Sequence, residues 1–541
     1  MAIGETVDGT ILLARRSRRG KASNSVADAR SEGKLVNRIL LVALVLGGSV
    51  DMLFYRKATG ISALVFAGLL VGALVTMGVM ERVRVAWRNL WLLLPLLFFA
   101  GMVAVRANRE LTLMNLGATF LLLMLFVYFF TGGRVEALGV LGYPLTVARM
   151  LRESLRRPAP MAGSMARRVV SNPTHNRRLF EIIRGLLIAL PILIVFTLLL
   201  SQADSIFEGL VNDFLKLRFM TSAPEALMRL GIIVASAWAI AGALMHALKP
   251  APSVTAQQVS GPPTVALQTR GLSFTEGALV LVLVNGLFAV FAWIQFTVLF
   301  SGQAARTMDF EEYREYVRRG FGELLVVALL TMVLILGLRR AMRRTTEGQE
   351  RNLNFLNTLM IGLAMVMLVS AFMRMVVWEN IQFYINTATR LYVRTFIVCL
   401  GALFVWLLFT TWVRRDRFAT GALLAGMAFI VTANGINPDA DVAAYNLRRN
   451  DELSTRYLYL LSEDAIPTLV AGLDTATGQV HNQLQRYLTN YLNRMEQDTG
   501  WQEWQSFHFS RQDAYNALVR AHEQGKFDTY NTPWTLRTTQ Y

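Results

Sequence analysis

The stretch EGALVLVLVNGLFAVFAWIQFTVLF, Glu276–Phe300, indicates the fold class, because it carries no charge after its first residue. A second apolar run, Glu323–Leu338, follows it and ends at a basic cluster that begins with Arg339. At about 1.5 Å per helical residue, about 20 residues cross a hydrocarbon layer of about 30 Å. The two runs therefore predict a membrane hairpin. Its connection, Phe310–Phe321 (FEEYREYVRRGF), is too charged to lie in lipid.

The composition extends this prediction to the whole chain. Of 541 residues, 54% are hydrophobic and 17% are charged, whereas about a quarter of a soluble chain is charged. The formal net charge is +17, but the basic residues are spread over short segments between apolar runs, so we expect no nucleic-acid partner. The single cysteine, Cys399, lies in an apolar run and predicts a packing role.

The apolar runs predict an all-α polytopic bundle of eleven membrane spans. The predicted spans are 35–54, 61–80, 90–106, 111–130, 182–201, 229–248, 277–300, 322–339, 354–377, 392–413 and 418–436. The third span is short and contains Pro95, which indicates a kink or a tilt. The mid-span polar residues Ser236, Asn285 and Gln295 predict hydrogen bonds between helices.

Lysine and arginine gather in alternate connections, such as 81–89 and 131–181, whereas 202–228 and the C-terminal region carry an acidic excess. By the positive-inside rule we expect a cytoplasmic N terminus and an extracytoplasmic C-terminal region in a bacterial plasma (inner) membrane. The predicted parts are a basic, disordered cytoplasmic tail over 1–34, a first block of six spans over 35–248, a cytoplasmic linker over 249–275, a second block of five spans over 276–436, and an extracytoplasmic helical domain over 437–541.

Two segments outside the spans have helical patterns of their own. Pro144–Arg157 carries a leucine stripe and an arginine stripe, which predicts either a helix in the membrane interface or a short helix docked on other spans. Beyond Asn437, apolar residues at helical spacing predict four helices. They lie at about 439–449, 453–472, 479–497 and 510–524, and Pro467 either breaks or kinks the second one.

Several segments resemble an uncharacterised family of bacterial multi-pass inner-membrane proteins with a helical extracytoplasmic tail. These segments are LLLSQADSIF (198–207), YREYVRRGFGE (313–323), TRLYV (389–393), NPDADVAAY (437–445) and LLSEDAIPTL (460–469). The similarity covers roughly 180–520, and the tyrosine–arginine–glycine connection is its most specific part. The resemblance implies a multi-pass architecture with this tail and brings no known activity.

The candidate site residues lie at the predicted outer ends of the spans and in the tail. The connection predicts a helix over Phe310–Arg319, after which Gly320 and Gly322 let the backbone turn into the membrane. Two interpretations of this helix are open. In the first, its tyrosines anchor it at headgroup depth; in the second, its charged residues surround a polar headgroup or a partner loop. The polar and interaction candidates are Asp51, Asp204, Tyr313, Arg314, Tyr316, Arg318, Arg319, Glu323 and Arg374. Arg374 can reach the surface, or pair with Glu323 or Asp51. Trp501 and Trp504 are the partner-binding candidates.

No catalytic, cofactor or metal motif stands out in the sequence. There is no P-loop, and the histidines are scattered without zinc-ligand spacing. We therefore predict no cofactor and favour a non-catalytic scaffold or accessory subunit of a membrane complex, whose partners are lipids and other membrane or extracytoplasmic proteins. The alternatives are a permease or flippase for a lipid-linked or small amphipathic substrate, and catalysis at the outer leaflet.

Overall fold

The computed structural model describes residues 34–160, 223–248, 272–297, 310–342, 346–381, 388–413, 417–448 and 458–527. Within these ranges the chain is helical and contains no strand; Leu272 and Met342 form one isolated bridge. The predicted all-α fold class is confirmed.

Nine helices among the described residues are long and apolar enough to cross a membrane. They are Lys34–Phe54, α2 (Ser62–Met80), α4 (Arg109–Tyr128), Pro224–Leu248 in α9 (Ala223–Leu248), α11 (Phe274–Gln295), Gly322–Ala341 in α13 (Phe310–Ala341), Glu347–Val376 in α14 (Glu347–Ile381), α15 (Ala388–Trp412) and α16 (Phe418–Ile436). The predicted span 90–106 is shorter: 3₁₀ helix η1 (Trp87–Leu92) continues into α3 (Leu93–Met102), where Pro95 lies in the first turn. The predicted span 182–201 lies outside the described residues.

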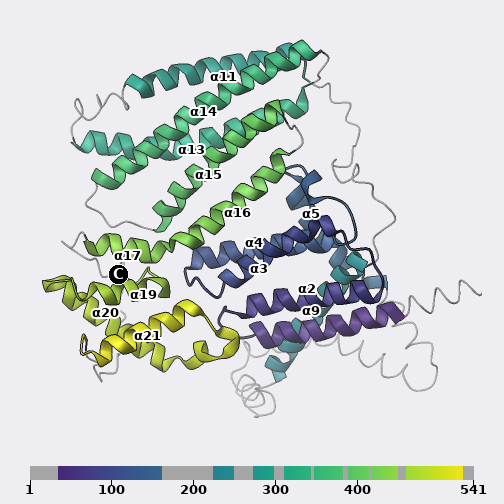
Figure 1. The fold of residues 1–541 in the computed structure, drawn as a ribbon, viewed down its shortest axis with the longest axis vertical. Coiled ribbons are helices and arrows are strands. Elements are labelled where there is room, and N and C mark those ends of the chain that lie inside the picture. The colour runs from purple at the N-terminus through teal and green to yellow at the C-terminus, as the bar shows by residue number, and fades with distance from the viewer. Residues whose placement is uncertain are drawn as a thin grey trace, which may run out of the picture.

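The membrane helices form two packed groups, as Figure 1 shows. One apolar core joins Lys34–Phe54, α2, α3, α4 and α9. A second core joins α11, α13, α14 and α15. Helix α16 lies between the groups, because it packs on α15 on one side and on α4 on the other.

Helix α13 differs from the prediction for its first turns. The expected turn at Gly320 and Gly322 is absent, and one continuous helix runs from Phe310 to Ala341. A glycine inside a helix costs only about 1 kcal/mol relative to alanine, so two glycines do not suffice to end it.

The C-terminal region folds around its own apolar core. Its helices are α17 (Pro438–Arg448), η4 (Glu463–Ala465), α19 (Ile466–Gly472), α20 (Gly478–Gln497), the short η5 (Thr499–Gln502) and η6 (Trp504–Ser506), and α21 (Phe509–Glu523). Pro467 lies in the first turn of α19, where its missing N–H has no cost, so it marks a new helix and not a kink. Leu484 and Leu488 of α20 pack on Leu518 of α21 in the core. These C-terminal helices are called the tail domain below.

The tail domain lies against one end of the first helix group (Figure 1). The N–H of Ile61 donates to the carbonyl of Phe507 at 2.9 Å, and the N–H of Phe509 donates to the carbonyl of Ala104 at 2.7 Å. Lys57 and Glu503 form an ion pair across the same contact. The connections 55–61 and 103–108 therefore form the end of the bundle on which the tail domain docks.

Helix α5 (Gly142–Arg156) lies near the opposite end and docks on α9 and α4. Tyr143, Thr146 and Met150 form its buried face. A Cβ on Gly242 of α9 would lie 1.9 Å from the carbonyl oxygen of Ser154, so the two helices touch through backbone. The docked alternative is thus observed for one face of this helix. Leucines such as Leu155 remain exposed on its outer side.

Candidate functional site

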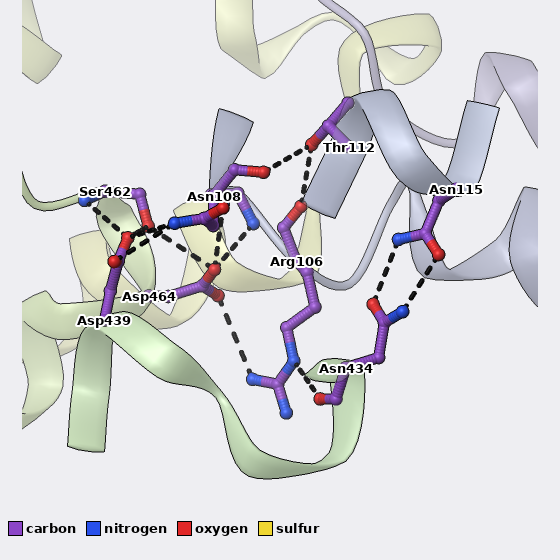
Figure 2. Close-up of polar contacts among 9 residues, drawn as sticks. Arg106, Asn108, Thr112, Asn115, Asn434, Asp439, Ser462 and Asp464 are labelled. Carbon is purple, nitrogen blue, oxygen red and sulfur yellow. Dashed lines mark hydrogen bonds and ion pairs between the residues drawn. The ribbon is translucent and has the colours of Figure 1, made fainter. Parts of the chain in front are cut away.

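A buried polar network joins the tail domain to the membrane helices, and Asn108 lies at its centre (Figure 2). Asn108 is the N-cap of α4, and its Oδ1 accepts a hydrogen bond from the N–H of Leu111 at 3.1 Å. Asparagine suits this position because its side chain replaces a missing backbone partner of the first turn. The hydroxyl of Thr112 donates to the carbonyls of Arg106 and Asn108 and fixes the chain that enters the helix.

Two aspartates of the tail domain converge on this helix end. Asn108 Nδ2 donates to both carboxylate oxygens of Asp439, each at 3.1 Å. The backbone N–H and the hydroxyl of Ser462 also donate to Asp439. Asp464 accepts from the backbone N–H groups of Ala107 at 2.8 Å and Asn108 at 3.0 Å. Asp439 is 2% exposed and Asp464 is 6% exposed, so water contributes little to either carboxylate.

The Arg106 side chain faces this acidic pair. Arg106 Nε donates to the carbonyl of Asn434 at 2.8 Å, and its Nη1 lies 3.9 Å from Asp464 Oδ1. Burial raises the pKa of the Asp464 carboxyl; hydrogen bonds from Ser510 and Asn108 and the Arg106 charge offset this only in part. Asp464 therefore binds a proton more readily than an exposed aspartate does.

Two further contacts connect the network to the spans. The Tyr392 hydroxyl of α15 donates to Asn108 Oδ1 at 2.7 Å. Asn115 of α4 and Asn434 of α16 exchange two side-chain hydrogen bonds of 3.0 and 2.9 Å. A network of this kind stabilises one arrangement of α4, α15, α16 and the tail domain, because separating them would leave buried polar groups without partners.

A pocket of about 220 Å³ lies beside this junction in the tail domain. It is lined by Trp501, Gln502, Phe507, His508, Gln512 and Tyr515. His508 is 3% exposed and contacts the backbone of Val103 and Arg106. Its Nδ1 has no hydrogen-bond partner among the residues that the structure describes. Burial, and then the nearby Arg511 charge, lower the pKa of His508 to about 4, so the imidazole is neutral at pH 7.

The sequence candidates lie in separate places. Asp51 pairs with Arg229 of α9 at 2.7 Å, and Arg229 also lies over the Tyr55 ring. Arg374, 4% exposed, donates to Gln295 Oε1 at 3.0 Å, beside a hydrogen bond from Ser370. The expected contacts of Gln295 and Asn285 between helices are confirmed, since Asn285 donates to the carbonyl of Leu356.

Among the remaining candidates, the structure describes the side chains of Glu323, Trp501 and Trp504. Glu323 is exposed at the start of the span part of α13. Trp501 packs against the tail-domain core, and its Nε1 donates to the Met495 carbonyl, whereas Trp504 is 51% exposed. Asp204 lies outside the described residues. The first turns of α13, described as backbone only, carry Tyr313, Arg314, Tyr316, Arg318 and Arg319.

The junction residues around Asn108 are not among the candidate site residues that the sequence indicates. Three segments of the family resemblance nevertheless carry them: TRLYV contains Tyr392, NPDADVAAY contains Asp439, and LLSEDAIPTL contains Ser462 and Asp464. These segments lie far apart in the sequence and meet at Asn108 in the structure. The sequence signal is the presence of polar residues within these family-like segments, whereas their convergence on Asn108 is visible only in the structure.

The helices and the docked tail domain define the class of an integral, multi-pass helical membrane protein. The family model of a domain of unknown function, DUF4153, matches residues 93–472, and the chain belongs to this family. The matched range starts well before residue 180 and contains Arg106, Asn108, Tyr392, Asp439 and Asp464. No curated protein and no solved structure matches the chain. Among the described residues, no group of three or more His, Cys, Asp or Glu side chains is placed to hold a metal ion.

Proposed function

We propose that this protein is a scaffold or accessory subunit of a membrane complex, and that its tail domain binds a partner protein. The observation that supports this proposal is the junction around Asn108, which fixes the tail domain on the bundle through buried hydrogen bonds. A fixed domain presents one surface in one orientation. A partner then binds without the entropic cost of ordering the domain first.

The proposed contact surface lies around the pocket beside the junction. The lining side chains include the aromatic residues Trp501, Phe507 and Tyr515. Trp504 is close to them in the sequence, and half of its surface is exposed. Aromatic side chains dominate the binding energy of many protein interfaces. A pocket of about 220 Å³ has room for one bulky apolar or aromatic side chain of the partner.

We place the tail domain on the extracytoplasmic side of a bacterial plasma membrane. Exposed arginines of the opposite end support this orientation, among them Arg82, Arg84, Arg88 and Arg134, because cytoplasmic connections are enriched in Lys and Arg.

Site-specific photo-crosslinking in cells tests the proposal. A photo-reactive amino acid replaces Trp504, and a matched control replaces Gln479, which is exposed on the first turn of α20. We expect position 504 to capture one defined polypeptide and position 479 to capture far less of it. Capture of the same products at both positions, or of no protein at position 504, would refute a partner surface there.

The second candidate function is a permease or flippase, and a different feature favours it. An apolar groove of about 660 Å³ lies between Lys34–Phe54 and α2, with Gly68 and Gly72 on its floor. A Cβ on either glycine would meet no atom within 4 Å, so Gly68→Leu starts from open space and adds apolar volume to the groove. A flippase would lose lipid transfer in proteoliposomes through this change, whereas the scaffold would keep its crosslink from position 504.

A further inference from the structure

At the end of the bundle away from the tail domain, two connections line an open surface pocket of about 500 Å³. Residues Ala86, Trp87 and Arg88 line it from the α2–α3 connection, and Gly133, Arg134 and Ala137 line it from the segment after α4. The proposed partner surface does not use this pocket. It brings two guanidinium groups and an indole from separate connections to one opening.

The two connections are held together by specific hydrogen bonds. The N–H of Ala86 donates to the carbonyl of Phe130 at 2.9 Å. Asn89, which is buried, donates from Nδ2 to the carbonyls of Phe129 at 2.9 Å and Gly133 at 3.3 Å. Gly133 has a φ of +79°, a backbone conformation that favours glycine and turns the chain toward Arg134. The spacing of the two arginine-bearing segments is therefore set before any ligand arrives.

Arg88 and Arg134 form no ion pair within the described residues, whereas Arg38 pairs with Glu81 and Arg157 pairs with Glu153. Two guanidinium charges at one opening repel each other, and an anion bound between them offsets this repulsion. A guanidinium group donates paired hydrogen bonds to phosphate oxygens, and this geometry makes arginine the residue suited to phosphate recognition.

The apolar rim of the pocket indicates the source of the phosphate. Trp87 is 79% exposed, and an indole favours the boundary between headgroups and hydrocarbon. Leu94, about two helical turns further along, is also exposed and lies toward the membrane-crossing part of the bundle. Basic pockets at the cytoplasmic ends of membrane helices bind anionic headgroups.

We propose that the pocket lined by Trp87, Arg88 and Arg134 binds the phosphate of an anionic phospholipid headgroup. The lipid phosphate lies between the guanidinium groups, and the acyl chains follow the apolar side of α3 below Trp87. This site does not depend on the partner surface of the tail domain.

Native mass spectrometry of the full-length protein tests the proposal with phosphatidylglycerol added to detergent micelles. The test variant is Arg88→Gln with Arg134→Gln. The matched control is Arg84→Gln with Arg82→Gln, which removes two exposed arginines of the same connection that do not line the pocket. We expect the test variant to lose phosphatidylglycerol binding at least about tenfold and the control less than about twofold. Equal losses in both variants would overturn the proposal, because nonspecific charge would then explain the binding.

A second arm separates a lipid from a soluble ligand. Inorganic phosphate and glycerol phosphate are added to the wild-type protein as competitors. We expect neither to displace the phospholipid at a hundredfold excess. Full displacement by either competitor would overturn a lipid site in favour of a soluble phosphate site. Thermal unfolding of the variants checks that each one folds. A further variant, Asn89→Ala, removes the hydrogen bonds to the Phe129 and Gly133 carbonyls but no charge, and it should weaken lipid retention.

Discussion

Replacing Asn108 with alanine is the sharpest test of the junction between the tail domain and the bundle. The change removes the N-cap hydrogen bond to Leu111, both hydrogen bonds to Asp439, and the acceptor of the Tyr392 hydroxyl. It leaves a buried carboxylate with fewer donors and a buried hydroxyl without its acceptor.

The magnitude follows from these losses. An N-cap contributes about 1 kcal/mol, and each buried group that loses its partner costs about 1–3 kcal/mol. The N-cap to Leu111 and the contact with Tyr392 lie within the bundle, so their loss destabilises the bundle and leaves the opening equilibrium unchanged. Only the hydrogen bonds to Asp439 cross to the tail domain, so its opening should become easier by about 1–3 kcal/mol, roughly ten- to hundredfold in the opening equilibrium.

Hydrogen exchange with mass spectrometry measures this opening on the full-length protein in nanodiscs. We expect faster exchange in α17, α19 and the start of α21, with little change in α14, which lies in the other helix group. Tyr392→Phe, which removes one hydrogen bond, should show a much smaller effect. Asn108→Asp keeps the cap and the acceptor for Tyr392 but places a carboxylate against Asp439, so its opening should be suppressed at low pH.

The reasoning would be refuted if Asn108→Ala left exchange in α17, α19 and α21 at the wild-type rate while the protein remained folded. In that case the contacts around Lys57 and Phe507 would hold the tail domain without help from the network.

Two further predictions concern pH and packing. The pKa of His508 is about 4 in the folded protein and about 6.5 in the unfolded chain. The neutral imidazole therefore contributes fully to the stability of the folded protein above pH 6.5. This contribution, at most about 3 kcal/mol, is lost as the pH falls toward 4. The unfolding midpoint of the tail domain should fall over this window, and His508→Gln should remove that part of the slope; an identical slope in the variant would contradict the assignment. Gly242→Ala should destabilise the α5–α9 contact by about 1–3 kcal/mol, because its Cβ meets the Ser154 carbonyl, and thermal unfolding should show this. The control Gly231→Ala, where a Cβ meets nothing within 4 Å, should be neutral or slightly stabilising, and a similar loss in both variants would show that close packing is not the cause.

Much of the architecture could be predicted from the sequence, because span length and hydrophobicity are local properties. The run Glu276–Phe300 gave α11, and the apolar spacing around Leu484 and Leu488 gave α20. The continuity of α13 could not be predicted, since helix propensity alone does not decide whether two glycines end a helix.

The junction could not be predicted for a different reason. In the sequence, Asn108 and Asp439 are polar residues next to apolar runs, a position that normally faces water or headgroups. Only the fold shows that both are buried, across a separation of 331 residues. Asp51 was identified as a charged residue near the membrane, but its partner Arg229 follows from the packing of α9, which no local pattern specifies.

The passage from α16 to α17 has a mechanical consequence. A single residue, Asn437, makes this turn in the left-handed conformation with a φ of 53°, and α17 begins at the very next residue, Pro438. Because no flexible linker separates the two helices, a rotation of α17 would have to turn the last residues of α16 with it. Asn434 of that helix exchanges two hydrogen bonds with Asn115, so such a rotation would also displace the polar contact between α16 and α4.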